Sequence, residues 1–197
     1  QTMGITLKFY ACVSSNHSTL DAIRLMQQER HFGAADVKKM IVNGSQVTMD
    51  HVGWTYCSQG LTSAQLNLPY CVATWLLEGD CFVDQFTEAM VADLQRMLLA
   101  EKVEVRHDAE ITARGLKLRH MVRVERELND GTRMSRVVEA GRGNEKNFAS
   151  EADVVEKFHK LAAWAIPKVQ AEQVVGWFMT IEKCSDASEL PRLLTPL

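Results

Sequence analysis

The feature that most constrains the fold is a mostly apolar segment between Ser63 and Leu77, interrupted by a single proline. A helix that is apolar on nearly all sides is stable only when other elements cover it, so this segment predicts a central buried helix. Pro69 removes one backbone hydrogen bond and predicts a kink or break near Leu68. Gly79 is the expected end of the helix, because glycine accepts the left-handed conformation found at many helix C-termini.

Strand patterns on both sides of this helix predict a mixed fold. Residues 37–49 combine β-branched and apolar residues with polar ones and predict a strand with an interruption at Asn43-Gly44. Residues 116–128 alternate between apolar and charged side chains, which predicts a half-buried strand with His120 on its apolar face. A hairpin turn is expected at Asp130-Gly131, because this pair tolerates positive φ. Shorter strands are predicted at 103–105 and 134–139.

Helical spacing of apolar residues accounts for most of the remaining chain. Ser150 with Asp153 approximates a capping box at the start of one helix. Helices are predicted at 17–30, 84–100, 151–162 and 170–183, with a short turn at 188–194. The sequence therefore predicts an α+β domain over 1–145, with a small, mainly antiparallel sheet packed with helices. An all-helical segment is predicted over 150–197.

Composition excludes several classes of protein. Hydrophobic residues make up 46% and charged residues 24% of the 197 residues, as in ordinary globular proteins. The net charge of -3 comes from scattered acids and bases, so no basic patch points to nucleic acid. No apolar run approaches the roughly 20 residues that span a bilayer. The five cysteines form no C-x-x-C pair, which argues against a zinc site or disulfide framework and for a reducing, cytoplasmic location.

Three blocks of the sequence carry a resemblance that extends over nearly the whole chain. The blocks are SAQLNLPYCVATWLLEG at 63–79, KFYAC at 8–12 with HSTLDA at 17–22, and a weaker set at 102–105, 130–131 and 143–147. Their order and spacing resemble the second half of enzymes of the MmgE/PrpD family. This family includes 2-methylcitrate dehydratase, cis-aconitate decarboxylase and iminodisuccinate epimerase.

The resemblance implies that residues 1–145 form a lid over a large helical domain, to which residues 150–197 return. Family members are more than twice as long as this chain, and their main acid and base residues precede the lid. They act on small di- or tricarboxylates without a metal or cofactor, by removing a proton α to a carboxylate. We therefore expect the chain alone to be inactive. Apolar groups that lack the helical domain are expected either to drive self-association, as in a homodimer or larger homo-oligomer, or to leave the C-terminal tail disordered.

Three residues are candidates for the site. Lys8 is a surface lysine on sequence grounds alone, but the resemblance implies that it binds a substrate carboxylate. Tyr70 suits an amphipathic core position, and the resemblance implies an active-site donor. His17 is a structural or capping histidine by itself. Near a helix N-terminus a neutral imidazole is favoured, which could polarise a substrate oxygen as a catalytic group.

Two departures from the family pattern bear on the reaction. Val13 stands where the decarboxylase branch has a second histidine, and valine transfers no protons, which argues against decarboxylation of cis-aconitate. Phe9 replaces a common proline. The expected function is a 2-methylcitrate dehydratase-like lyase, with an epimerase-like isomerase and a non-catalytic lid module as alternatives. Residues 142–147 are expected to form a solvated connection rather than an anion-binding loop.

Overall fold

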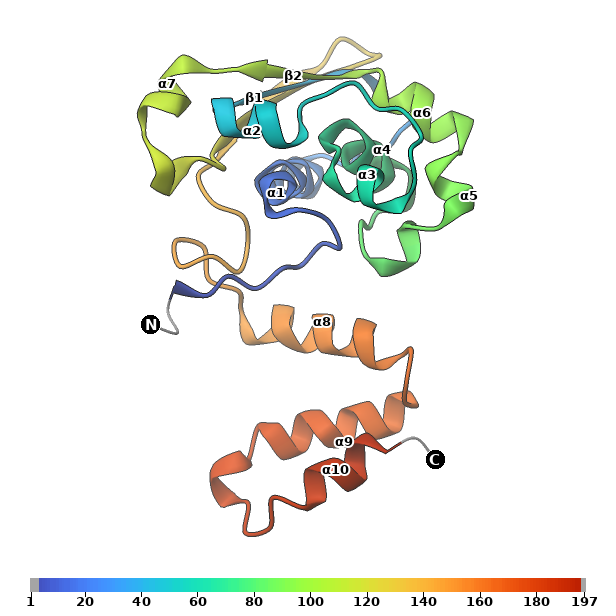
Figure 1. The fold of residues 1–197 in the computed structure, drawn as a ribbon, viewed down its shortest axis with the longest axis vertical. Helices are drawn as coiled ribbons and strands as arrows, with labels where there is room; N and C mark the ends of the chain where they lie inside the picture. Colours follow the sequence, from blue (N-terminus) through green and yellow to red (C-terminus); the bar gives the residue numbers. More distant parts are fainter. Residues whose placement is uncertain (1–3, 196–197) are drawn as a thin grey trace. The chain divides into compact units, whose positions relative to one another are not determined.

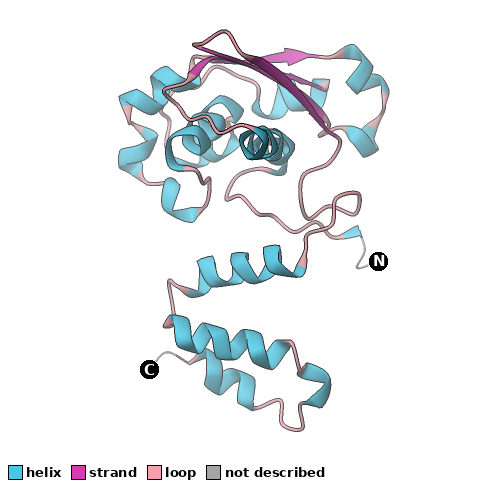
Figure 2. Ribbon diagram, turned by 180° about the vertical axis from the view of Figure 1, so that it is seen from behind, coloured by secondary structure: helices cyan, strands magenta, loops and turns pink. Residues whose placement is uncertain are grey.

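The computed structural model describes residues 4–195. The chain divides into two compact units, Gln1–Phe148 and Ala149–Leu197. The first contains a four-stranded sheet and several helices, whereas the second is built from helices alone (Figure 2). This arrangement confirms the predicted α+β class. Among the described residues, no helix has the length and apolar character needed to cross a membrane.

The sheet of the first unit has the strand order β2-β1-β3-β4. Its strands are β1 Val37–Gly44, β2 Val103–His107, β3 Val122–Leu128 and β4 Arg133–Val138. β1 runs parallel to β2 and antiparallel to β3, and β3 is antiparallel to β4. The predicted hairpin turn connects β3 to β4, with Gly131 at φ 82°. In β3 buried and half-buried residues alternate, as expected for a sheet with one covered face.

Two helices cover that face of the sheet (Figure 1). α1 (Ser14–Glu29) packs on β3 and β4, and α4 (Leu68–Glu78) packs on β2 and on α1. The core between them is formed by side chains that are fully buried, among them Leu20, Ile23, Met26, Met40, Val42, Val72 and Val124. Burial of each such side chain stabilises the fold by about 1.5–3 kcal/mol relative to exposure.

The apolar segment is split at the predicted position. α3 (Leu61–Leu66) ends before Asn67, and α4 begins directly after it. The Asn67 side chain accepts a hydrogen bond from the backbone N–H of Tyr70, and Pro69 occupies the first turn, where a missing N–H costs little. Gly79 ends α4 at φ 70°. The predicted break and the predicted glycine cap are therefore confirmed.

The predicted strand at 37–49 is interrupted at Asn43-Gly44 as expected, but it does not resume after Gly44. Ser45 accepts a hydrogen bond from the N–H of Thr48 and begins α2 (Gln46–Val52). The serine side chain accepts a hydrogen bond from a backbone N–H in the first turn of the helix. This local hydrogen bond favours a helix start, and it outweighs the strand preference of the β-branched residues that follow.

The predicted helix at 84–100 is wrong as a continuous element. It consists of a 3-10 turn η2 (Val83–Gln85), α5 (Glu88–Val91) and α6 (Leu94–Ala100). Thr87 and Asp93 each accept a hydrogen bond from a backbone N–H three residues ahead and start a new helix. Apolar spacing alone does not reveal such internal caps.

The predicted strand at 116–128 is also too long. After β2 the chain forms α7 (Ala109–Ala113) and a 3-10 turn η3 (Leu116–Leu118), and β3 begins only at Val122. Gly115 at φ 80° sets the direction of this turn. His120 therefore lies in the turn before β3 and not on the apolar face of a strand, as had been expected.

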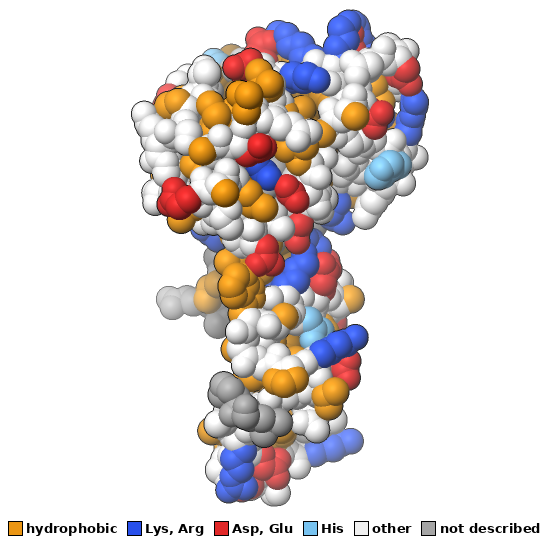
Figure 3. Space-filling model, turned by 90° about the vertical axis from the view of Figure 1, so that its right-hand side faces the viewer, with side chains coloured by type: hydrophobic (Ala, Val, Ile, Leu, Met, Phe, Trp, Pro, Cys, Tyr) orange, Lys and Arg blue, Asp and Glu red, His pale blue; other side chains and the backbone are white. Residues whose placement is uncertain are grey.

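The second unit contains α8 (Glu151–Ala162), α9 (Lys168–Phe178), a 3-10 turn η4 (Ile181–Lys183) and α10 (Glu189–Leu194). The Ser150–Asp153 capping box at the start of α8 is confirmed. Four small buried residues form its core, namely Ala162, Ile166, Ala171 and Val174. Hydrophobic side chains remain on its surface (Figure 3). The most exposed of them include Trp164, Val169, Phe178, Met179, Leu161 and Ile181.

Candidate functional site

Hydrogen bonds join the N-terminal block at 8–22 to the block at 63–79. The N–H of Val13 donates to the carbonyl of Gln65 at 3.1 Å, and the Gln65 amide donates to the carbonyl of Ala11 at 2.9 Å. The N–H of Ala11 donates in turn to the carbonyl of Cys81 at 3.0 Å. The extended segment before α1 is thus fixed against α3 and the end of α4.

The loop after β4 closes over the same N-terminal block. The N–H of Leu7 donates to the carbonyl of Gly143 at 3.1 Å. Buried Asp21 accepts hydrogen bonds from the N–H of Arg142 and from the hydroxyl of Tyr10. The sequence blocks at 8–22, 63–79 and 143–147 therefore meet in one region of the fold.

A cavity of about 150 Å³ lies between this loop, the start of α1 and the turn before β3. Its walls include three cations, Lys117, Arg119 and Arg142, but only one carboxylate, that of Glu139. Two histidines, His17 and His120, complete its titratable groups; the other lining residues are Thr6, Ser14, Ser18, Ala140, Gly141 and Asn144. An excess of cations in a small polar cavity suits an anionic ligand.

Of the three predicted site residues, His17 lines this cavity. It lies in the first turns of α1, which begins at Ser14, earlier than expected. Its side chain is only 3% exposed, and its ring packs edge-on against Tyr10 at 5.1 Å between centroids. Its Nε2 atom has no hydrogen-bond partner among the described residues. A buried polar atom without a partner costs free energy and is available to a ligand.

Tyr70 and Lys8 are not among the residues that line the cavity. Lys8 is exposed in the segment before α1. Tyr70 is fully buried in α4, with its ring 4.7 Å from that of Tyr56 and 5.9 Å from that of Phe86. The structure thus does not group Tyr70 with His17, and a ligand could reach its hydroxyl only after the covering side chains move.

The hydroxyl of Tyr70 stays protonated over the whole physiological range. Burial raises the pKa of Tyr70 to about 12, although Arg96 and Thr74 act in the opposite direction. The oxygen makes no hydrogen bond within ordinary geometry among the described residues. It is therefore a protonated phenol without a hydrogen-bond partner among the described residues.

His120 lies at the rim of the cation-lined cavity and is held in its neutral form. The guanidinium Nε of Arg119 donates to its Nε2 at 3.1 Å. Burial lowers the pKa of His120 to about 4, helped by the charges of Arg119, His51 and His17. The imidazole therefore acts as an acceptor for Arg119 at neutral pH and fixes the position of that cation.

This depressed pKa predicts a loss of stability in mild acid. The unfolded imidazole takes up a proton below about pH 6.5, whereas the folded one resists until about pH 4. Stability is therefore fully present above pH 6.5 and is lost as the pH falls towards 4, by about 2 kcal/mol after allowance for partial exposure. Urea unfolding across this range measures the loss. His120→Gln cannot take up the proton and should lose about 2 kcal/mol less; equal losses would contradict the assignment.

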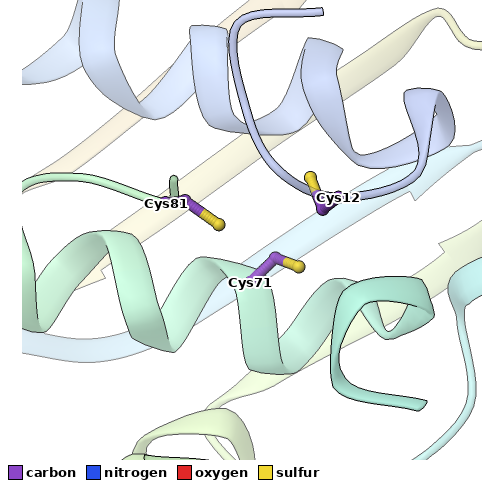
Figure 4. Close-up of side chains that lie close together, drawn as sticks. All are labelled: Cys12, Cys71 and Cys81. Carbon is purple, nitrogen blue, oxygen red and sulfur yellow. The ribbon is translucent and has the colours of Figure 1, made fainter. Parts of the chain in front are cut away.

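A second cluster of titratable groups consists of Cys12, Cys71 and Cys81, all buried and all free thiols (Figure 4). Burial alone would raise the pKa of Cys12. The neighbouring thiols of Cys71 and Cys81, together with His17, outweigh this effect and hold the pKa of Cys12 well below its usual range. Burial, with its neighbour Cys12, raises the pKa of Cys71 well above that range. Hydrogen bonding with Cys12 raises the pKa of Cys81 likewise.

Sequence reasoning missed both the cysteine cluster and the cations of the cavity. The cysteines are separated by 59 and 10 positions and form no short motif. Arg142 belongs to the loop that had been interpreted as a solvated connection, yet it stacks on the Phe9 ring at 4.3 Å and lines the cavity. The Gly141-Arg142-Gly143 spacing was the only local signal for this role, because glycines let a loop approach a neighbouring segment closely.

Comparison with known proteins gives the class to which this fold belongs. The family profile described as the MmgE/PrpD C-terminal domain matches residues 10–179. The chain therefore belongs to the MmgE/PrpD family, as the sequence blocks had indicated.

Curated relatives are decarboxylases by name. A cis-aconitate decarboxylase-like protein, oryM, of Aspergillus oryzae is 26% identical over 99% of this chain and 41% of its own length. A cis-aconitate decarboxylase of Aspergillus terreus is 25% identical over 98% of this chain and 41% of its own length. The chain thus spans about two fifths of the length of these relatives. They support membership of a family of lyases.

Proposed function

We propose that this chain is the lid and C-terminal part of a lyase that acts on small di- or tricarboxylates. The reaction begins with removal of a proton α to a carboxylate, followed by loss of water. The single observation that carries this proposal is the cavity lined by Lys117, Arg119 and Arg142 where the resembling blocks meet. Cations there match the carboxylates of a substrate and the negative charge that develops as the carbon acid ionises.

In this proposal, Lys8 and the cavity cations bind substrate carboxylates. The segment that carries Lys8 is tied to the loop at 143–147 by the hydrogen bond from the N–H of Leu7 to the carbonyl of Gly143. The Lys8 side chain itself is exposed, so it is available to a ligand. His17, with its unpartnered and buried Nε2, polarises a substrate oxygen. Tyr70 donates to the enolate-like oxygen after its covering side chains move. The base that removes the proton comes from the helical domain of the same enzyme.

The second unit supports the proposal that a second domain of the enzyme completes the site. A groove of about 250 Å³ on it is lined by apolar side chains only, namely Val154, Val155, Phe158, Val174, Val175, Phe178 and Met179. Exposed apolar surface of this kind is typical of an interface. The proposed partner is the N-terminal helical domain, and without it the isolated chain should associate with copies of itself.

Decarboxylation of cis-aconitate is the second candidate, because the curated relatives carry that name. Dehydration is preferred here on account of Val13. Its side chain is half-buried and packs against the apolar core, so no proton donor occupies this position. Decarboxylation needs a proton delivered to the carbon that loses CO2, and valine supplies none.

Assays of the longer enzyme that carries this chain test the proposal. It is incubated with 2-methylcitrate, citrate or cis-aconitate, and alkene formation and CO2 release are followed separately. We expect alkene from the hydroxy acids and no CO2 from cis-aconitate. The 197-residue chain alone should be inactive, since it lacks the base.

Each alternative predicts a different result in the same assays. CO2 release from cis-aconitate would establish the decarboxylase. Proton exchange with deuterated water without alkene, tested with an amino dicarboxylate, would establish an epimerase. Absence of turnover and exchange with all these acids would leave a non-catalytic lid module and would refute the proposed lyase. A measurable rate with the chain alone would refute the assignment of the base to another domain.

A further inference from the structure

Three cysteines that are far apart in the sequence meet in the interior of the first unit. Cys12 precedes α1, Cys71 lies in α4 and Cys81 follows α4 (Figure 4). Their sulfur atoms all lie within 4.8 Å of one another, and no side chain of the three is more than 4% exposed. We infer that these thiols form a site for one soft, thiolate-binding metal ion, of the class that includes Zn²⁺ and Cu⁺.

The size of the cluster fits such an ion. A metal bonded to three sulfurs at about 2.3 Å each holds those sulfurs roughly 4 Å apart. The thiols already lie within 4.8 Å of one another, so binding requires contraction of less than about 1 Å. Thiolates are soft donors, which select Zn²⁺ or Cu⁺ and disfavour Mg²⁺ or Ca²⁺.

The surrounding residues already hold two of the donors in place. The side-chain amide of Asn16 donates to the Cys71 sulfur at 3.3 Å. The carbonyl of Cys81 accepts the N–H of Ala11 at 3.0 Å, which ties Cys81 to the segment that carries Cys12. Hydrogen bonds of this kind orient metal ligands and hold them in position before the ion binds.

The cluster supplies three protein donors. Among the described residues, His17 is not one of the groups whose ligand atoms lie within 4.8 Å of all three sulfurs. Three thiolates satisfy Cu⁺, whereas structural Zn²⁺ takes four ligands, so a zinc ion here would have to recruit a fourth ligand from outside the cluster. The two ions are therefore distinguishable by their ligands.

Such an ion would have a structural role that is independent of the proposed lyase function. It would link the segment before α1 to the N-terminal half of α4 and to the loop that follows α4. On binding, the three thiols release their protons to solvent, and the ion offsets part of the thiolate charge, which leaves a net charge of −1 with Zn²⁺ (+2 and −3) and of −2 with Cu⁺ (+1 and −3). Because the sulfurs are buried, the ion is taken up as the chain folds.

The test uses the full chain with Cys57→Ser and Cys184→Ser, which leaves only the three clustered cysteines. The reduced, unfolded protein is refolded with Zn²⁺ alone or Cu⁺ alone, freed of excess metal and measured for metal content. X-ray absorption then counts the ligands. We expect one ion per chain with three sulfurs at about 2.3 Å, plus one lighter donor atom for Zn²⁺ only.

A further Cys71→Ser substitution in this protein should weaken binding at least ~100-fold in competition with a chromogenic chelator. The inference is overturned if the protein with the three cysteines folds but retains neither ion. It is also overturned if a bound ion has fewer than three sulfur ligands. These two results come from the protein with an intact cluster, so they hold whether or not Cys71→Ser folds.

Discussion

Tyr70→Phe is expected to lower the activity of the longer enzyme at least ~100-fold while leaving the fold as stable or more stable. The hydroxyl of Tyr70 is buried and has no hydrogen-bond partner among residues 4–195, so its removal breaks no hydrogen bond within this part of the chain. Removal of a buried, unpaired donor changes stability by between zero and about +1 kcal/mol. A donor to a developing oxyanion, in contrast, is worth about 2.7–4 kcal/mol in the transition state.

The neighbouring Tyr56 supplies a matched control. Its ring lies 4.7 Å from that of Tyr70, but its hydroxyl donates to the carbonyl of Val91 at 2.8 Å. Tyr56→Phe should therefore cost about 1 kcal/mol of stability and change kcat by no more than about twofold. Measurements of kcat and of urea unfolding on both variants give opposite patterns if Tyr70 is the donor. A Tyr70→Phe enzyme with normal kcat would exclude this role.

Gly143→Ala is expected to destabilise the first unit by on the order of 3 kcal/mol. Gly143 has φ 90°, and a Cβ atom there would lie 2.4 Å from the carbonyl oxygen of Leu7 and 2.9 Å from the Phe9 ring. The left-handed conformation costs about 1–2 kcal/mol for alanine, and the contact with a backbone oxygen adds to it because the backbone cannot move aside cheaply. Urea unfolding followed by circular dichroism measures the loss.

Gly131→Ala separates the two contributions. Gly131 has a similar φ of 82°, but nothing lies within 4 Å of the Cβ position. Gly131→Ala should therefore lower the free energy of unfolding by only the conformational cost, about 1–2 kcal/mol. Hydrogen exchange of the Leu7 amide, which donates to Gly143, should accelerate in Gly143→Ala and not in Gly131→Ala. Equal losses in both variants would show that the loop moves away from Leu7 without cost.

Local chemistry in the sequence determined several parts of the fold. The break before Pro69, the glycine cap at Gly79 and the hairpin at Asp130-Gly131 were all predicted. The capping box at Ser150 was predicted as well. Each depends on residues within a few positions of one another, and so does the burial of α4, which follows from its apolar composition. A sequence displays such short-range causes directly.

Competing local signals account for the errors. The segment 84–100 has helical spacing throughout, yet Thr87 and Asp93 restart the helix twice. Ser45 ends a β-branched strand in the same way. Hydrophobic periodicity indicates which face of a segment is buried, but it does not indicate which group accepts each backbone N–H. The boundaries of these helices and of the strand were therefore determined by the capping side chains.

The tertiary structure alone decided which candidate side chains lie together. His17 and Arg142 face one cavity across 125 positions of sequence, and Cys12 meets Cys71 across 59. Tyr70 and Lys8, which the sequence blocks singled out, lie outside that cavity. Long-range contacts depend on how helices pack on the sheet, a result of the whole core and not of any single segment. The sequence thus determined the family and its elements, and packing determined which side chains meet.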